Sequence, residues 1–181
     1  MSTAASPRSC DAFGGVAIVM GVAGCGKSTV GAALAEALGA RFIEGDLLHP
    51  AANIAKMASG VALTDDDRWP WLDAVGQASS AGNVDGRGAI ASCSALKRTY
   101  RGRLIEAAGQ PVAFVFLDGD RMLLEARLRQ RPGHFMPASL LASQLAALEV
   151  PGADELATTV DFTWPVEAVV ARAMAFLRSL G

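Results

Sequence analysis

The 181-residue chain lacks several features that would assign it to a specialised structural class. It has only three cysteines, an odd number, in a chain long enough to build a core without disulfides, so we expect reduced thiols and a cytoplasmic protein. No stretch reaches the roughly eighteen uncharged apolar residues of a membrane helix. These absences exclude a disulfide scaffold and predict no membrane partner.

An excess of positive charge is missing as well. Sixteen Lys and Arg stand against eighteen Asp and Glu, which gives a formal net charge of -2. A protein that binds nucleic acid usually concentrates basic residues, and this composition supplies no general positive field. We therefore expect no nucleic-acid partner.

Apolar residues, by contrast, are abundant and make up 51% of the chain. A chain of this length buries roughly 70% of its unfolded surface, so disorder throughout is excluded. Residues 1–15 are rich in Ser, Ala and Gly without hydrophobic periodicity. We expect them to form a flexible N-terminal segment, followed by a single domain over residues 16–181.

Short apolar runs alternate with segments of helical periodicity along that domain. Helical spacing is clearest from Val166 to Leu177, and residues 79–88 have the composition of a surface connection. Strands that alternate with helices need crossover connections, which favour a parallel sheet covered on both faces. The predicted fold class is therefore α/β. The runs typical of buried strands are residues 16–20, 41–45, 89–93, 112–117 and 158–162.

A phosphate-binding loop follows the first predicted strand. Residues 21–28 match the pattern G-x-x-x-x-G-K-S/T, and a predicted helix comes next. Backbone N–H groups of such a loop surround phosphates, while Lys27 is expected to reach the terminal phosphates and Ser28 to bind Mg²⁺. We therefore expect ATP and Mg²⁺ as cofactors. The candidate ATP-binding residues are Gly21, Val22, Ala23, Gly24, Cys25, Gly26, Lys27, Ser28 and Thr29.

Two questions about this loop stay open in the sequence. Cys25 is either a redox-sensitive thiol, activated by Lys27 and the helix N-terminus, or a small residue that the loop tolerates. The second question is the class of phosphate-loop protein. No Asn-Lys-x-Asp segment of the kind that reads guanine is present. A small-molecule kinase is therefore favoured over a GTPase, and a non-catalytic nucleotide-binding regulatory module is the alternative of a different class.

Several segments together resemble the bacterial type of gluconokinase, a relative of shikimate and nucleoside monophosphate kinases. The resemblance implies a P-loop kinase with strand order 2-3-1-4-5 and a small lid around residues 127–137. It also implies ATP-dependent phosphorylation of D-gluconate to 6-phospho-D-gluconate by a homodimer. A sister kinase for shikimate or another sugar acid is the closer alternative. The segments are residues 20–28, 44–50, 53, 56–57, 65–68, 70–72, 93–97, 100–101, 133–136, 148–149 and 151.

Asp46 is the candidate catalytic base. It follows the second predicted strand, and ligands of doubly wound sheets bind at the carboxyl ends of strands. A carboxylate there suits orienting or deprotonating an acceptor hydroxyl. The alternative is that Asp46 caps the helix that starts near Pro50.

An anionic acceptor calls for a guanidinium, and Arg68 is the first candidate. It follows three aspartates, so the alternative is that it merely offsets their charge at a helix start. Lys97 and Arg101, at i and i+4, are further candidates for substrate binding, and a plain surface pair is their alternative.

The remaining candidates depend on the resemblance. It implies substrate binding by His134 and a structural or substrate role for His49, the only two histidines. It also implies that Arg127 and Arg131 are catalytic lid arginines that neutralise the transferring phosphates. An exposed cationic helix end is the alternative for the two arginines.

Overall fold

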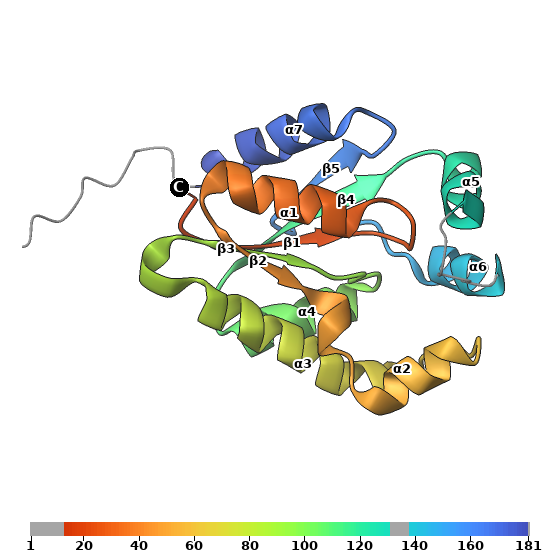
Figure 1. Cartoon of the computed structure of the whole chain (residues 1–181). Helices are drawn as coiled ribbons and strands as arrows, with labels where there is room; N and C mark the ends of the chain where they lie inside the picture. Colours follow the sequence, from red (N-terminus) through yellow and green to blue (C-terminus); the bar gives the residue numbers. More distant parts are fainter. Residues whose placement is uncertain (1–12, 131–137, 181) are drawn as a thin grey trace, which may run out of the picture.

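The protein is built on one five-stranded sheet. The structure, a computed structural model, describes residues 13–130 and 138–180. The strand order is β2-β3-β1-β4-β5, and every neighbouring pair is parallel (Figure 1). The predicted α/β class and the strand order are confirmed. The strands are β1 (Val16–Met20), β2 (Arg41–Glu44), β3 (Ala89–Ser92), β4 (Val112–Asp118) and β5 (Ala157–Asp161).

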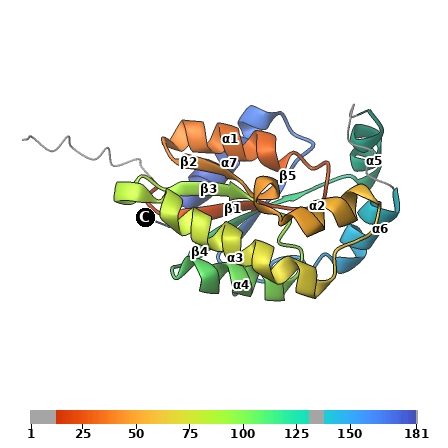
Figure 2. The same cartoon turned by 60° about the horizontal axis from the view of Figure 1, so that its bottom comes forward.

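Helices cover both faces of the sheet. Helices α1 and α7 lie on one face and α3 and α4 on the other, while α2, α5 and α6 gather at the carboxyl end of the strands (Figures 1 and 2). Within the described ranges, no helix has the length and apolar character needed to cross a membrane. The helices are α1 (Lys27–Leu38), α2 (Ala51–Ala58), α3 (Asp65–Gly82), α4 (Arg98–Ala108), α5 (Arg121–Gln130), α6 (Ala138–Ala147) and α7 (Val166–Arg178), with short 3₁₀ turns η1 (Gly45–Leu48) and η2 (Val84–Gly86).

The sheet separates two hydrophobic cores. Side chains alternate along a strand, so Val19 of β1 packs into the core under α1 and α7, while Ile18 packs into the core above α3 and α4. All of β1 is buried, because it is the central strand with helices on both sides. This rigid centre carries the phosphate loop at its carboxyl end.

Helix α3 is longer than the sequence predicts. The segment 79–88 was expected to be a surface connection, but α3 continues to Gly82 and only the residues after it form the connection. Ser79 is completely buried, and its hydroxyl donates to the carbonyl of Val75 at 2.7 Å. A Cβ on Gly82 would lie 2.9 Å from the Ile43 side chain. Small residues here permit close packing of the helix on the sheet. The same Ser and Gly residues are typical of turns, which is why the sequence predicts a surface connection.

The expected flexible segment 1–15 includes two residues that contact the domain, Phe13 and Gly14. Phe13 is only 7% exposed and belongs to the core under α1 and α7. The backbone of Gly14 accepts a hydrogen bond from Asn83 at 2.9 Å. A lone aromatic residue produces no periodicity, so the sequence pattern could not place it. Residues 1–12 lie outside the described residues.

Candidate active site

The phosphate loop occupies the turn between β1 and α1. Gly24 and Gly26 have φ of 85° and 96°, a region that side chains make costly. Gly26 is the N-cap of α1 and provides no side-chain cap, so the amides of the first helical turn have no intrahelical acceptor. These amides and the helix dipole make the loop suitable for binding phosphate.

Two of the predicted ATP-binding residues face the core instead of solvent. The side chains of Val22 and Cys25 are 4% and 1% exposed. They can therefore contribute only backbone atoms to a nucleotide site. Burial raises the pKa of the Cys25 thiol, and the opposing effect of Lys27 is smaller. A buried thiol with a raised pKa argues against the redox alternative and for a packing role.

Lys27, Ser28 and Thr29 lie at the open side of the loop. The ammonium of Lys27 donates to the carbonyl of Val22 at 3.0 Å, so the side chain folds back over the loop. Ser28 and Thr29 are exposed in the first turn of α1. Their hydroxyls are accessible to a ligand that sits on the loop.

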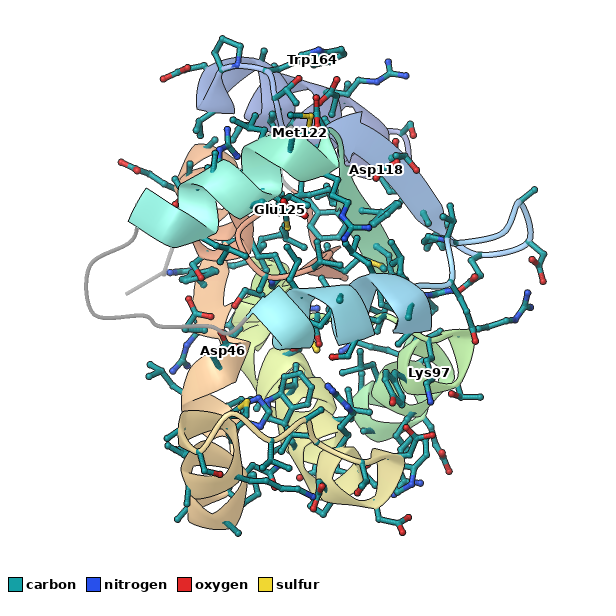
Figure 3. All side chains as sticks on the ribbon, turned by 90° about the vertical axis from the view of Figure 1, so that its right-hand side faces the viewer. Asp46, Lys97, Asp118, Met122, Glu125 and Trp164 are labelled. Carbon is teal, nitrogen blue, oxygen red and sulfur yellow. The ribbon has the colours of Figure 1, made fainter. Side chains whose placement is uncertain are left out.

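Asp46 is held at the carboxyl edge of the sheet by its neighbour Gly45. A Cβ on Gly45 would lie 2.0 Å from the carbonyl oxygen of Ser92, so only glycine fits between β2 and β3. The Gly45 amide donates to Ser92 Oγ at 3.1 Å, and Trp71 Nε1 donates to the Gly45 carbonyl at 2.8 Å. This turn presents Asp46 at the edge shown in Figure 3.

The carboxylate of Asp46 is exposed and accepts no hydrogen bond from the part of the chain that the structure describes. Helix α2 begins at Ala51 with Pro50 as its N-cap and without a side-chain cap. The alternative that Asp46 caps this helix is therefore wrong. Its charge is free to act on a ligand.

His49 is the next polar residue along this edge. Its ring stacks on Trp71 with centroids 4.0 Å apart and an angle of 14°. Burial lowers its pKa from 6.5 to about 4, so the imidazole is neutral at pH 7. Asn53 Nδ2 lies 3.4 Å from Nδ1, and an amide nitrogen can only donate. Nδ1 is thus the acceptor. Nε2 carries the proton and can donate a hydrogen bond to a ligand hydroxyl.

A pocket of about 110 Å³ opens between the N-terminal ends of α3 and α4 and helix α6. It contains two of the residues predicted to bind substrate, Arg68 and Lys97. Acidic, basic, hydroxyl and amide groups line it together, which is a suitable lining for a small polar ligand. The lining residues are Ala62, Leu63, Asp65, Arg68, Leu96, Lys97, Tyr100, Ser143, Gln144 and Ala147.

The aspartates before Arg68 have other partners. Asp65 accepts from Lys97 at 2.8 and 2.9 Å and from the Tyr100 hydroxyl, and these bonds lower its pKa. Asp67 completes a capping box with Thr64 and pairs with Lys56. Hydrogen bonds to Lys97 and Tyr100 therefore act on Asp65 more strongly than the charge of Arg68 does.

Arg68 itself forms no ion pair with a carboxylate of the described residues. Its guanidinium carbon lies 5.6 Å from the centroid of the Tyr100 ring, at the pocket. The side chain is half-buried, which strengthens its attraction for an anion relative to a fully solvated arginine. The guanidinium fork is available to a carboxylate ligand.

Lys97 lines the same pocket with its ammonium held by Asp65. It is the N-cap residue that precedes α4. Lys97 and Arg101 do not face the same side, because Arg101 is directed into the protein.

The structure contradicts a substrate-binding role for Arg101. The residue is 1% exposed, and its Nε and Nη2 donate to the carboxylate of Glu155 at 2.6 and 2.9 Å. Nη1 donates to the carbonyls of Ala95, Leu96 and Glu149. Ala95 has φ of 44°, an unfavourable conformation for alanine, so Arg101 stabilises a strained connection between β3 and α4. The sequence pattern shows a cation on a helix, and only the tertiary structure shows which way it points.

Arg127 points from α5 towards the end of β5. Its guanidinium lies 5.2 Å from the Phe162 ring, and Nη2 donates to the Phe162 carbonyl at 3.4 Å. Its charge also acts on Cys25 in the phosphate loop. Arg127 is thus an exposed residue of α5 whose guanidinium is directed towards Phe162 and whose charge reaches the phosphate loop. Arg131, His134 and most of the expected lid lie outside the described residues.

The buried Cys93 at the end of β3 shows how close the charged groups are. Burial raises the pKa of its thiol to about 12. Asp46 raises this pKa further, whereas Lys27 and Arg68 lower it. The charges of three groups predicted to orient the acceptor, bind phosphate and bind the substrate anion thus all act on one strand end.

Sequence reasoning missed Gln144, which connects the pocket to the phosphate loop. Its Oε1 accepts a hydrogen bond of 2.7 Å from the Ala23 amide. In the sequence it follows Ser143 in a largely apolar helical segment, and a polar residue in such a segment is typical of a solvent-facing position. No local signal identified it.

The fold and this site define a class of protein. A parallel sheet of order 2-3-1-4-5 that carries a phosphate loop on its central strand, with a polar pocket beside the loop, is a P-loop kinase. The chain matches the family model described as "AAA domain" over residues 16–151.

Individual relatives identify the family more closely. A gluconokinase of Gluconobacter oxydans is 53% identical over 76% of this chain and 77% of its own length. The thermoresistant gluconokinase of Escherichia coli is 44% identical over 89% of this chain and 92% of its own. The crystal structure of a gluconokinase from Sinorhizobium meliloti, 50% identical, superimposes with a TM-score of 0.83 over 93% of this chain and 94% of its own. The chain belongs to the gluconokinase family and is a kinase.

Proposed function

We propose that this protein catalyses the ATP-dependent phosphorylation of D-gluconate at its 6-hydroxyl, with 6-phospho-D-gluconate as the product. The observation that carries the proposal is Arg68, a half-buried guanidinium without a carboxylate partner among the described residues, in a polar pocket next to the phosphate loop. Gluconate has one carboxylate and a row of hydroxyls, which match this lining. The names of the relatives point to the same substrate.

The phosphate loop would bind the nucleotide. Its amides donate hydrogen bonds to the phosphates, the N-terminus of α1 stabilises their negative charge, and Lys27 neutralises the terminal phosphates. The described residues contain no group of three His, Cys, Asp or Glu that could hold a metal. Mg²⁺ commonly binds through one or two protein oxygens together with substrate phosphates, and the exposed Ser28 hydroxyl fits that pattern. The ion would supply further neutralisation of the phosphates.

Residues of the η1 turn after β2 and of α3 would align the acceptor. Arg68 binds the carboxylate of gluconate, and the neutral His49 donates its Nε2 proton to a hydroxyl. Asp46 then orients the reacting hydroxyl and takes its proton. Because phosphoryl transfer depends mainly on position and charge, these residues and Lys27 act chiefly by holding two anions in line. Arg127 adds positive charge from the α5 side. The roles implied for Arg131 and His134, the homodimer and the cytoplasmic location stay predictions.

A coupled assay with a panel of acceptors tests the proposal. We expect kcat/KM for glucose, which matches most hydroxyls but lacks the carboxylate, to be at least about thirtyfold lower than for gluconate. Leaving a buried guanidinium without its anion costs on the order of 2 to 5 kcal/mol, and the half-buried Arg68 falls at the lower end of this range. Turnover of shikimate or another sugar acid in place of gluconate would assign a sister kinase. ATP binding without turnover of any acceptor would assign a non-catalytic module.

Arg68→Lys tests the carboxylate contact itself. The variant keeps the charge but loses the fork, so we expect KM for gluconate to rise about tenfold with little change in KM for ATP. Arg103→Lys is the matched control, because Arg103 pairs with Asp73 away from the pocket. An unchanged gluconate KM in Arg68→Lys would transfer the carboxylate contact to Lys97.

A further inference from the structure

Helix α6 lies between the two halves of the site. In Figure 3 it crosses the carboxyl edge of the sheet, with α5 on one side and Asp46 and Lys97 on the other. Gln144 on this helix lines the acceptor pocket and also accepts the hydrogen bond from the Ala23 amide of the phosphate loop. One side chain therefore touches both halves.

The two polar atoms of Gln144 are distinguishable. A backbone N–H can only donate, so the atom that faces Ala23 at 2.7 Å is Oε1. The amide nitrogen Nε2 has no acceptor among the residues that the structure describes. It is the donor that a hydroxyl or carboxylate in the pocket would meet.

Helix α6 is anchored beyond this contact. The backbone amide of Glu149, just after the helix, donates to the Leu96 carbonyl at 2.8 Å. The Glu149 carboxylate accepts from the Arg98 amide at 2.7 Å, and its carbonyl accepts from Arg101 at 2.9 Å. The connection between β3 and α4 thus holds the end of α6.

The same connection holds the phosphate loop, because the Gly21 amide donates to the Ser94 carbonyl at 3.3 Å. Hydrogen bonds therefore join three segments in a closed ring beside the pocket: the phosphate loop, the connection between β3 and α4, and α6. Of the ring's described members, Gln144 is the side chain that both lines the pocket and accepts a hydrogen bond from a phosphate-loop amide.

We propose that Gln144 is a positioning residue that couples the acceptor pocket to the phosphate loop. An acceptor that receives a hydrogen bond from Nε2 fixes the side chain with Oε1 on the Ala23 amide, and this orders the loop for the nucleotide. Because coupling between two binding sites is reciprocal, the bound nucleotide increases the affinity for the acceptor by the same factor. The inference rests on the proposed function, since it takes gluconate as the acceptor.

The test measures the coupling directly. The affinity for a non-hydrolysable ATP analogue with Mg²⁺ is determined by calorimetry with and without saturating gluconate. For the unmodified protein we expect gluconate to tighten analogue binding about fivefold. In Gln144→Leu and Gln144→Ala we expect this factor to fall to about one, with kcat/KM for gluconate reduced about tenfold.

Gln110→Leu is the matched control. Gln110 is also half-buried and also makes one amide hydrogen bond, to Ser80 at 3.0 Å, but it lies just before β4, away from the pocket. It should keep the fivefold factor. A merely structural role for Gln144 would lower the unfolding temperature and leave the coupling factor unchanged.

Failure of this inference and failure of the proposed function look different. A protein that phosphorylates gluconate but shows no coupling, or keeps its coupling in both Gln144 variants, overturns the inference alone. A protein that does not phosphorylate gluconate overturns the proposed function and the inference with it.

Discussion

The phosphate loop and the acceptor pocket are neighbours in space but are built in different ways. The loop is one continuous segment whose donors are backbone amides and whose geometry depends on glycines with positive φ. The pocket combines side chains from α3, α4 and α6. A backbone site can be encoded by a short pattern, whereas a side-chain site needs the fold to bring its members together.

Sequence separation makes the difference concrete. The Lys27 ammonium bonds to a carbonyl five residues away. In the pocket, Lys97 pairs with Asp65 across 32 residues, and Arg101 behind it pairs with Glu155 across 54. Substitutions in the loop should therefore reduce turnover without affecting the stability of the fold. Substitutions around the pocket should instead affect substrate specificity or stability.

The largest effect is expected from the loop. Lys27→Ala removes the charge that acts on the terminal phosphates, so we expect kcat to fall by about 10³-fold or more. The half-exposed side chain contributes little to the core, and the unfolding temperature should stay unchanged. Arg172→Ala on the exposed side of α7 is the control and should retain normal turnover. Near-normal turnover in Lys27→Ala would contradict the phosphate role of the loop.

Asp46→Asn disrupts the acceptor half instead. The amide keeps the shape but cannot take a proton, so we expect kcat to fall about 10²-fold or more while the affinity for an ATP analogue stays the same. Steady-state kinetics combined with analogue binding separates the two quantities. Lost analogue affinity at unchanged kcat would remove Asp46 from the acceptor half.

Arg101→Leu tests the support behind the pocket. The substitution leaves the nearly buried Glu155 without its partner, and we expect the free energy of unfolding in urea to fall by about 3 kcal/mol. The double variant Arg101→Leu/Glu155→Leu should recover part of this loss, because both charges are then removed. Unchanged stability with a raised gluconate KM would return Arg101 to the list of substrate ligands.

The smallest effect concerns His49 and pH. Its pKa is about 4 in the folded protein, against 6.5 for an unperturbed histidine. As the pH falls from about 6.5 towards 4, the unfolded chain takes up a proton that the folded protein refuses, so stability decreases in this window. We expect a smaller decrease of the unfolding temperature between pH 7 and pH 5 in His49→Asn. Identical pH dependence in both proteins would contradict the lowered pKa.

Much of the fold could be predicted from the sequence. The five strands and the phosphate loop between β1 and α1 follow from apolar runs and glycines, and the structure confirms them. The position of Asp46 after β2 is equally local. These features depend on neighbouring residues and on the rule that parallel strands end at one edge.

The errors share one cause. Phe13, the last turn of α3 and the inward direction of Arg101 depend on contacts with residues far along the chain. The availability of the Arg68 guanidinium likewise depends on Asp65 and Asp67 having partners elsewhere in the chain, Lys97 and Lys56.

The sequence by itself thus determined the α/β sheet and the backbone site for phosphate, because periodicity and glycine conformation act over a few residues. Only the tertiary structure decided which charged side chains pair inside the protein and which face the pocket. The physical reason is that a buried charge must find a partner, and the partner of Arg101 lies in a segment that no short pattern connects to it. The role of Gln144 could not be predicted from a short pattern for the same reason, since its partner is a backbone amide 121 residues away.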